Sequence, residues 1–198
     1  MTQTLVPAKL TFSQKLARAV LRLAGWRVED KLPDSQKYVL LAAPHTSNWD
    51  FVFMLLFRAA LGIKAHWAAK DTFFRGPWGA LLKKIGGIPV NRRSRNNFVD
   101  QIVAAFRQCE EMILVIAPEG TRSMVGYWKS GFYYMAMGAG VPIALGFLDY
   151  GRKVGGIGPS ICPTGDIYAD FAAIREFYAG IAGKHPRRQG EIKLRDAT

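Results

Sequence analysis

Apolar positions along the chain fall into two patterns, short unbroken runs and longer stretches with a three- to four-residue period. Residues 37–43 form such a run, and further segments of strand length occur at residues 64–70, 87–91, 112–120 and 141–150. Helical periodicity occupies the intervals between them, at residues 47–62, 76–86, 95–110 and 129–140. Two short β-prone pieces around Val154 and Ile161 precede a helix near residues 168–183. Strands that alternate with helices predict a single α/β domain, with a mixed but mostly parallel sheet flanked by helices.

An amphipathic helix is predicted ahead of this core, at residues 10–26. Its apolar residues Phe12, Leu16, Val20 and Leu23 recur at helical steps, and its basic residues lie on another side. Such a helix either packs on its own domain or lies in a membrane interface, where Trp26 would anchor it. We divide the single domain 1–198 into an N-terminal amphipathic segment at 1–31, an α/β core at 38–165 and a loose polar tail at 184–198.

Composition narrows the class of protein. Lys and Arg total 27 against 15 acidic residues, a net charge of +12, which attracts nucleic acid, anionic lipid or phosphorylated small molecules. No apolar run approaches the roughly 18–20 residues that a membrane span needs, and the N-terminal apolar residues alternate with Lys and Arg, unlike a signal peptide. Cys109 and Cys162 lie far apart without histidine neighbours, so we expect reduced packing residues in a cytoplasmic protein and no metal site.

Charged and titratable groups collect at three strand exits, where α/β proteins place their ligands. His45 and Asp50 follow the first run, Arg92 the third, and the block Pro118-Glu119-Gly120-Thr121-Arg122 the fourth. A neutral imidazole works as a general base when a second group holds its tautomer, and Asp50 is suited to that role. The alternative is a histidine that only hydrogen-bonds a local turn.

The Glu-Gly-Thr-Arg turn adds groups that bind anions. Arg122 offers a planar, permanently charged fork for a phosphate, and Glu119 can steer that fork or bind a substrate hydroxyl. Gly120 allows the turn to adopt backbone conformations that other residues disfavour. The alternative is a structural turn with an exposed Glu–Arg pair of little energetic weight. Lys70, at the exit of the second strand, is either a phosphate contact or a solvated side chain.

The order of these motifs resembles the glycerolipid acyltransferase family, above all its lysophosphatidate (1-acylglycerol-3-phosphate) acyltransferases. The likeness rests on His-x4-Asp after the first strand, a glycine-containing strand that ends in Arg92, the Glu-Gly-Thr-Arg turn and a Val-Pro-Ile strand, and it covers residues 38–150. It implies transfer of a fatty acyl group from acyl-CoA or acyl carrier protein to a hydroxyl of a lysophospholipid or glycerol-phosphate-type acceptor, in phospholipid biosynthesis.

The resemblance also assigns roles to residues of this chain. His45 would be the general base and Asp50 its orienting partner, while Val141-Pro142-Ile143 would support an acyl channel or strand packing. No cofactor is implied beyond the acyl thioester as co-substrate. The acceptor and its phosphate would be bound by Arg92, Glu119, Gly120, Thr121 and Arg122.

A direct displacement is expected rather than an acyl-enzyme, because no serine stands in a G-x-S-x-G context. Backbone amides near Gly120 or Ser47 are the candidate donors to the oxyanion. An anionic membrane surface is the expected partner, which would place the protein peripherally at the cytoplasmic face of the membrane. Two other interpretations stay open: a peripheral lipid-binding protein without catalysis, and a basic nucleic-acid-binding module. The second is less favoured, because the sequence has no nucleic-acid-binding motif, and we expect no nucleic acid as a partner.

Overall fold

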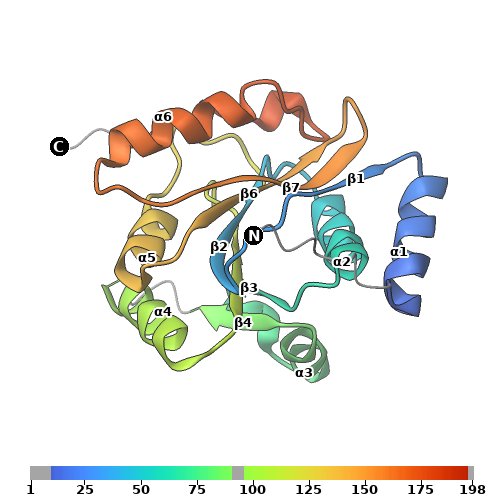
Figure 1. Cartoon of the computed structure of the whole chain (residues 1–198), viewed down its shortest axis with the longest axis horizontal. Helices are drawn as coiled ribbons and strands as arrows, with labels where there is room; N and C mark the ends of the chain where they lie inside the picture. Colours follow the sequence, from blue (N-terminus) through green and yellow to red (C-terminus); the bar gives the residue numbers. More distant parts are fainter. Residues whose placement is uncertain (1–9, 91–95, 196–198) are drawn as a thin grey trace, which may run out of the picture.

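One sheet of seven strands forms the centre of the molecule in the computed structural model, which describes residues 10–90 and 96–195 (Figure 1). The strands lie in the order β1-β7-β6-β2-β5-β3-β4. Neighbouring strands are parallel, apart from the antiparallel pair β6 and β7. Their bounds are β1 Arg27–Asp30, β2 Lys37–Ala43, β3 Ala65–Lys70, β4 Gly87–Val90, β5 Met112–Ile116, β6 Ile143–Asp149 and β7 Val154–Ile161.

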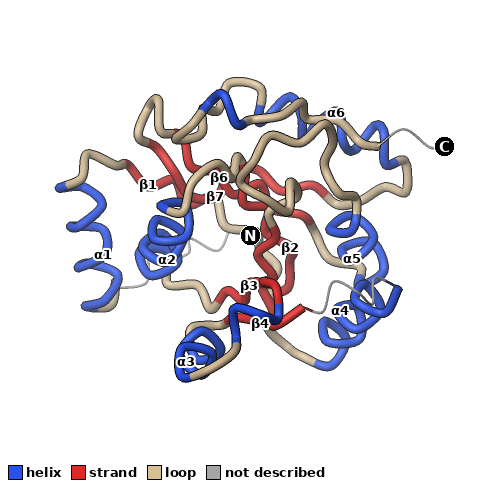
Figure 2. Tube along the Cα trace, turned by 180° about the vertical axis from the view of Figure 1, so that it is seen from behind, coloured by secondary structure: helices blue, strands red, loops and turns tan. Residues whose placement is uncertain are grey.

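Helices cover both faces of the sheet, as Figure 2 shows from behind. One face carries α4 (Asn96–Gln108), α5 (Gly131–Ala139) and α6 (Ile167–Tyr178), and the other carries α2 (Trp49–Leu61) and α3 (Pro77–Lys84) (Figure 1). Helix α1 (Phe12–Leu23) packs against α2. None of these helices is both long and apolar enough to span a bilayer, within the described ranges. The predicted α/β domain with a mostly parallel, helix-flanked sheet is confirmed.

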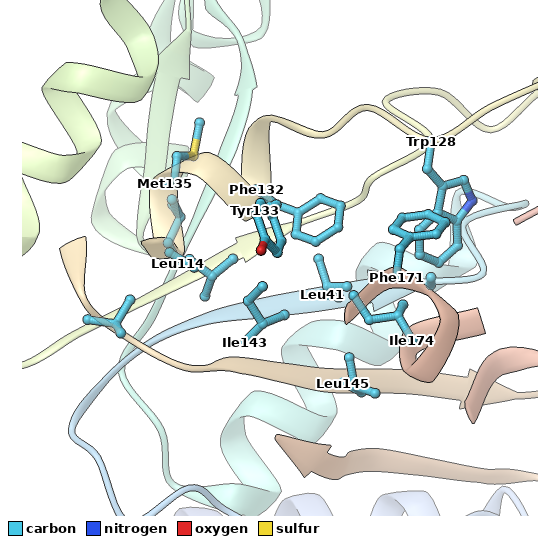
Figure 3. Close-up of a cluster of buried hydrophobic side chains, with 14 of the residues drawn as sticks. Leu41, Leu114, Trp128, Phe132, Tyr133, Met135, Ile143, Leu145, Phe171 and Ile174 are labelled. Atoms are coloured by element: carbon cyan, nitrogen blue, oxygen red, sulfur yellow. The ribbon is translucent and has the colours of Figure 1, made fainter. Parts of the chain in front are cut away.

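The alternation of side chains along β2 explains why its sequence is apolar after Lys37. Val39 and Leu41 point into the core under α4, α5 and α6, whereas Tyr38 and Leu40 point into the core under α2 and α3. Figure 3 shows the first of these cores, where strand residues meet aromatic side chains of α5 and α6. A strand buried on both faces has no polar positions, so its run is continuous.

The N-terminal segment departs from the prediction in two ways. Helix α1 starts at a capping box on Thr11 and ends at Leu23, and the chain then turns into strand β1 instead of continuing as a helix. Trp26 is not a membrane anchor, since it is 5% exposed and packs against rings of α2. Its ring centroid lies 4.5 Å from that of Phe53 and 5.0 Å from that of Tyr150.

Strand β1 (Arg-Val-Glu-Asp) pairs with β7, which is one strand rather than two short pieces. Gly156 in β7 has a φ of 140°, and a Cβ there would lie 1.8 Å from the carbonyl oxygen of Glu29. The close approach of the two backbones therefore requires a glycine.

The C-terminal segment is packed, so the prediction of a loose tail at 184–198 is wrong for its described part. The backbone N–H of His185 donates to Thr46 Oγ1 at 3.1 Å, and Leu194 forms a bridge with Trp128. Between these contacts, a Cβ on Gly190 would lie 1.8 Å from the carbonyl oxygen of Val125. Residues 184–195 therefore form a strap, which runs from the exit of β2 to the loop before α5.

Candidate active site

His45 and Asp50 lie in contact at the exit of β2. The strand ends at Ala43, a cis Ala43–Pro44 peptide bond follows, and α2 begins at Trp49 with Asp50 in its first turn. His45 Nδ1 lies 3.2 Å from Asp50 Oδ2. The imidazole is about a quarter exposed and the carboxylate is 5% exposed. The short loop between strand and helix thus brings together the two side chains that the five-residue spacing suggested.

Asp50 is held as an anion by four donors. Its Oδ2 accepts the backbone N–H groups of Thr46 and Ser47, each at 2.8 Å, and its Oδ1 accepts the hydroxyl of Tyr150 at 2.8 Å. Burial alone would raise the pKa of Asp50, but the hydrogen bonds from His45, the Ser47 amide and Tyr150 outweigh burial and lower that pKa.

The surroundings of Asp50 also determine which imidazole nitrogen carries the proton. A carboxylate is an acceptor only, so the Nδ1 of His45 must be the protonated nitrogen in this contact. The Nε2 of the neutral ring is then left with a lone pair. This is the state that a general base requires.

Glu119, the first residue of the Glu-Gly-Thr-Arg turn, holds the backbone of His45. Its Oε1 accepts the N–H of His45 at 3.0 Å, while its Oε2 is buried without a hydrogen-bond partner among the described residues. Burial raises the pKa of Glu119. The alternative of an exposed Glu–Arg pair does not fit, because Glu119 is 8% exposed and faces His45, and no such pair is among the described ion pairs.

An apolar cavity of about 450 Å³ lies between α2 and the sheet. His45, Asn48 and Arg122 line it at the carboxyl end of the strands, where Arg122 is exposed. Its opposite end is lined by Leu61 and Ile63, next to the start of β3. Apart from Arg58 of α2, the walls between are apolar, so the cavity suits a hydrocarbon chain whose polar end lies beside His45.

The other predicted site residues lie elsewhere. Thr121 is exposed, and its Oγ1 accepts the N–H of Ser123. Gly120 has a φ of 67°, which favours glycine in this turn. Arg92 lies outside the described residues, as does the side chain of Lys70 at the end of β3. Val141 and Ile143 are buried in the core under α5, on the face of the sheet opposite the cavity, so they pack the strand instead of lining a channel.

The backbone amides of Ser47 and Gly120, two of those expected to stabilise an oxyanion, are already engaged in hydrogen bonds. The N–H of Ser47 donates to Asp50, and the N–H of Gly120 donates to the carbonyl of Ala117 at 3.0 Å. These two amides are therefore not the oxyanion donors in this conformation, and the other amides near them stay a prediction. Side-chain donors that line the cavity beside His45 are Asn48 and Arg122.

The sequence reasoning missed two residues that the structure places here. Tyr150 follows the last residue of β6, so the rule that ligands gather at strand exits, applied to this strand, would have found it. Arg58 lines the cavity from within an otherwise apolar stretch of α2, and a lone charge on an apolar stretch was the available signal.

Comparison with known proteins identifies the family and the fold. A search of curated proteins finds no significant match. Among solved structures, the chain is similar to the 1-acyl-sn-glycerophosphate (LPA) acyltransferase PlsC from Thermotoga maritima, with 16% sequence identity and a TM-score of 0.55. That match covers 86% of this chain and 80% of the other, and it shows a shared fold. The family model named Acyltransferase matches residues 14–144, more than half of the 198 residues and the part that carries His45, Asp50 and the Glu-Gly-Thr-Arg turn. As the order of its motifs predicted, the chain belongs to the acyltransferase family.

Proposed function

We propose that the protein is an O-acyltransferase that moves a fatty acyl group from an acyl thioester to a hydroxyl of a lysophospholipid or glycerol-phosphate-type acceptor. The observation that carries the proposal is the position of the His45–Asp50 pair at the polar end of an apolar cavity, with Arg122 on the same rim. The acyl chain of the donor would occupy the cavity. The thioester carbonyl would then lie beside His45 Nε2.

The reaction is a direct displacement. His45 Nε2 takes the proton of the acceptor hydroxyl while the oxygen attacks the thioester carbonyl, and Asp50 stabilises the imidazolium that forms. The tetrahedral intermediate then collapses, so that the C–O ester bond is kept and the C–S bond breaks. The proton on His45 passes to the departing thiolate. The proton taken from the acceptor hydroxyl thus ends on the thiol, so charge and protons balance in this sequence of steps without a metal or another cofactor.

Two side chains on the rim fit the remaining charges. Asn48 is exposed there without a side-chain capping bond, so its amide is available as a donor to the oxyanion. Arg122 carries the permanent charge that an acceptor phosphate would pair with. Glu119 would position His45 through the backbone, and its unpaired, buried Oε2 would meet an acceptor hydroxyl when the Glu-Gly-Thr-Arg turn shifts to admit it.

Replacing Glu119 separates its two roles. In Glu119→Gln, the side-chain carbonyl still accepts the N–H of His45, but an amide NH2 group, which donates, replaces the second oxygen. We expect the KM for the acceptor to rise about tenfold with a smaller change in the KM for the donor. Glu119→Ala leaves the buried N–H of His45 unpaired and should also lower the free energy of unfolding by about 1–3 kcal/mol. Steady-state kinetics and urea unfolding measure both effects, and equal changes in the two KM values would contradict the role in acceptor binding.

Helix α1 gives the protein an apolar surface suited to an anionic membrane. It packs on the domain through Ala17 and Leu21, yet Phe12 and Leu23 on another side are 82% and 89% exposed. Leu16 and Val20 lie between them and are also exposed. Basic residues of α1 lie beside these four exposed apolar side chains, as in helices that lie in the membrane interface. The helix can therefore pack on its own domain through Ala17 and Leu21 and also lie in a membrane interface through its exposed apolar side.

The double variant Phe12→Ser, Leu23→Ser tests the membrane proposal. Each side chain would bury its apolar surface in the bilayer, so their loss should weaken binding to vesicles of anionic phospholipid at least tenfold. Met124→Ser with Tyr168→Ser removes two similarly exposed side chains elsewhere and should leave flotation unchanged. Equal vesicle binding by both double variants would show that α1 does not hold the membrane. Point variants are preferable to removing the first 26 residues, which would take Leu21 and Trp26 out of the core.

The catalytic proposal itself is tested with labelled acyl-CoA and labelled acyl carrier protein, each offered a panel of lysophospholipids and glycerol phosphate. Transfer to one acceptor is expected, without added metal and in the presence of a chelator. Binding of these lipids with no transfer from either donor would leave a lipid-binding protein without catalysis. Salt-sensitive binding of DNA or RNA, with no lipid binding, would favour the nucleic-acid interpretation.

A further inference from the structure

The acyl cavity contains a charged group that the proposed reaction does not use. Arg58 lines the cavity from α2, between Met54 and Leu61, which also line it. The Nε of Arg58 is buried without a hydrogen-bond partner, and none of the described hydrogen bonds or ion pairs involves its guanidinium. The residue as a whole is half-buried.

Arg58 lies far along the cavity from the catalytic pair. It follows Asp50 by eight residues in the same helix, which corresponds to about 12 Å along the helix axis. The wall contributed by the sheet is apolar and includes Leu40, Val115 and Ile157. No carboxylate other than Asp50, at the catalytic end, lines the cavity among the described residues. The guanidinium therefore stands alone in the distal part of a hydrocarbon-lined space.

The energetics of this group depend on what fills the cavity. In the free protein, water in the cavity can hydrate the guanidinium, which keeps the cost of its partial burial small. A plain hydrocarbon chain that reaches Arg58 displaces this water and offers no acceptor in return, so it removes hydration from a charge without compensation. A chain that stops before Arg58 leaves the water in place. A chain whose end carries a carboxylate would replace the water with a paired, charge-assisted hydrogen bond.

We propose that Arg58 determines acyl-chain specificity, an inference that rests on the acyltransferase function proposed above. Plain acyl chains are used when their methyl end stops before Arg58. Chains long enough to cover Arg58 are used only when their distal end carries an anionic oxygen acceptor, with a carboxylate as the defining case.

Two matched series of acyl thioesters test this inference, one plain and one ending in a carboxylate, each rising in chain length. With wild-type protein, kcat/KM for plain chains should fall about tenfold or more once the chain reaches Arg58, within the range that pocket contacts provide. At that length the carboxylate-ended chain should be the better substrate. In Arg58→Leu the order should reverse, with the long plain chain gaining about tenfold and the carboxylate-ended chain losing its advantage.

A charge-matched control and a second readout keep the outcomes distinct. Arg175→Leu removes an exposed arginine from α6, far from the cavity lining, and should keep the wild-type order of substrates. Thermal shift with free fatty acids and dicarboxylic acids of the same lengths reports on the cavity without requiring catalysis. If wild type and Arg58→Leu show the same length profile in binding and turnover, the inference is overturned while the acyltransferase function stands. Absence of transfer with any thioester, together with the expected reversal in binding, would instead refute the proposed function and support the role of Arg58 in the cavity.

Discussion

The variant His45→Ala should lose acyl transfer by about 10²–10⁴-fold in kcat while keeping its fold, since general-base assistance typically contributes that much. His45 Nε2 is the group that would take the acceptor proton, and the alanine methyl leaves no basic atom at the mouth of the cavity. Asp50 keeps its bonds from Thr46, Ser47 and Tyr150 in this variant, so its local structure should persist. The KM for the acyl donor should change little, because the apolar walls hold the chain.

A matched histidine elsewhere provides the control. His66 in β3 is exposed and does not line the cavity, so His66→Ala should transfer acyl groups at the wild-type rate. Initial rates with saturating thioester and acceptor, together with circular dichroism of each variant, measure the comparison. Full activity in His45→Ala would exclude the imidazole from the chemistry, and with it the mechanism.

Asp50→Asn is expected to cost both activity and stability. The amide has no negative charge to stabilise an imidazolium and can pair with either tautomer of His45, so kcat should fall about 10²-fold or more. The hydrogen bonds to Oδ2 from Thr46 and Ser47 lose their charge-assisted character, which should lower the free energy of unfolding by about 1–3 kcal/mol. Tyr150→Phe removes one donor from Oδ1 but leaves the contact with His45, so its loss of activity should be smaller, about tenfold.

The stability difference between wild type and Asp50→Asn should depend on pH with a defined sign. The pKa of Asp50 is lower in the folded protein than in the unfolded chain, so its stabilising effect is complete above the unfolded value, near pH 4. That effect is lost as the pH falls through the folded pKa. The gap in Tm between the two proteins should therefore be widest near neutral pH and close below about pH 4. A gap that stays constant down to pH 3 would mean that Asp50 is not held as an anion.

The central strands and the contact between His45 and Asp50 could be predicted from sequence because local patterns determine them. The run at 37–43 coincides with β2, because a strand that is buried on both faces is apolar along nearly its whole length. The His-x4-Asp spacing joins a strand exit to the first turn of a helix, so the meeting of His45 and Asp50 needs few residues of chain. Both signals are short-range.

Features created by distant parts of the chain could not be predicted in the same way. Strand β1 has no apolar alternation and exists because Gly156 lets β7 approach it. Tyr150 is separated from Asp50 by 100 residues, and only the sheet order brings the exits of β2 and β6 together. Trp26 looked like an interfacial anchor because its burial depends on a turn that helical periodicity does not register.

The strap formed by residues 184–195 makes the catalytic loop sensitive to a part of the chain that carries no catalytic motif. The N–H of His185 in the strap donates to Thr46, whose own N–H donates to Asp50. Leu194, farther along the strap, forms a bridge with Trp128, which follows the Glu-Gly-Thr-Arg turn. A protein fused after Arg195, or a ligand wedged beneath the strap, would pull on the aspartate–imidazole geometry from outside. Changes in the strap should therefore alter the position of Asp50 without altering any group proposed to meet the substrate.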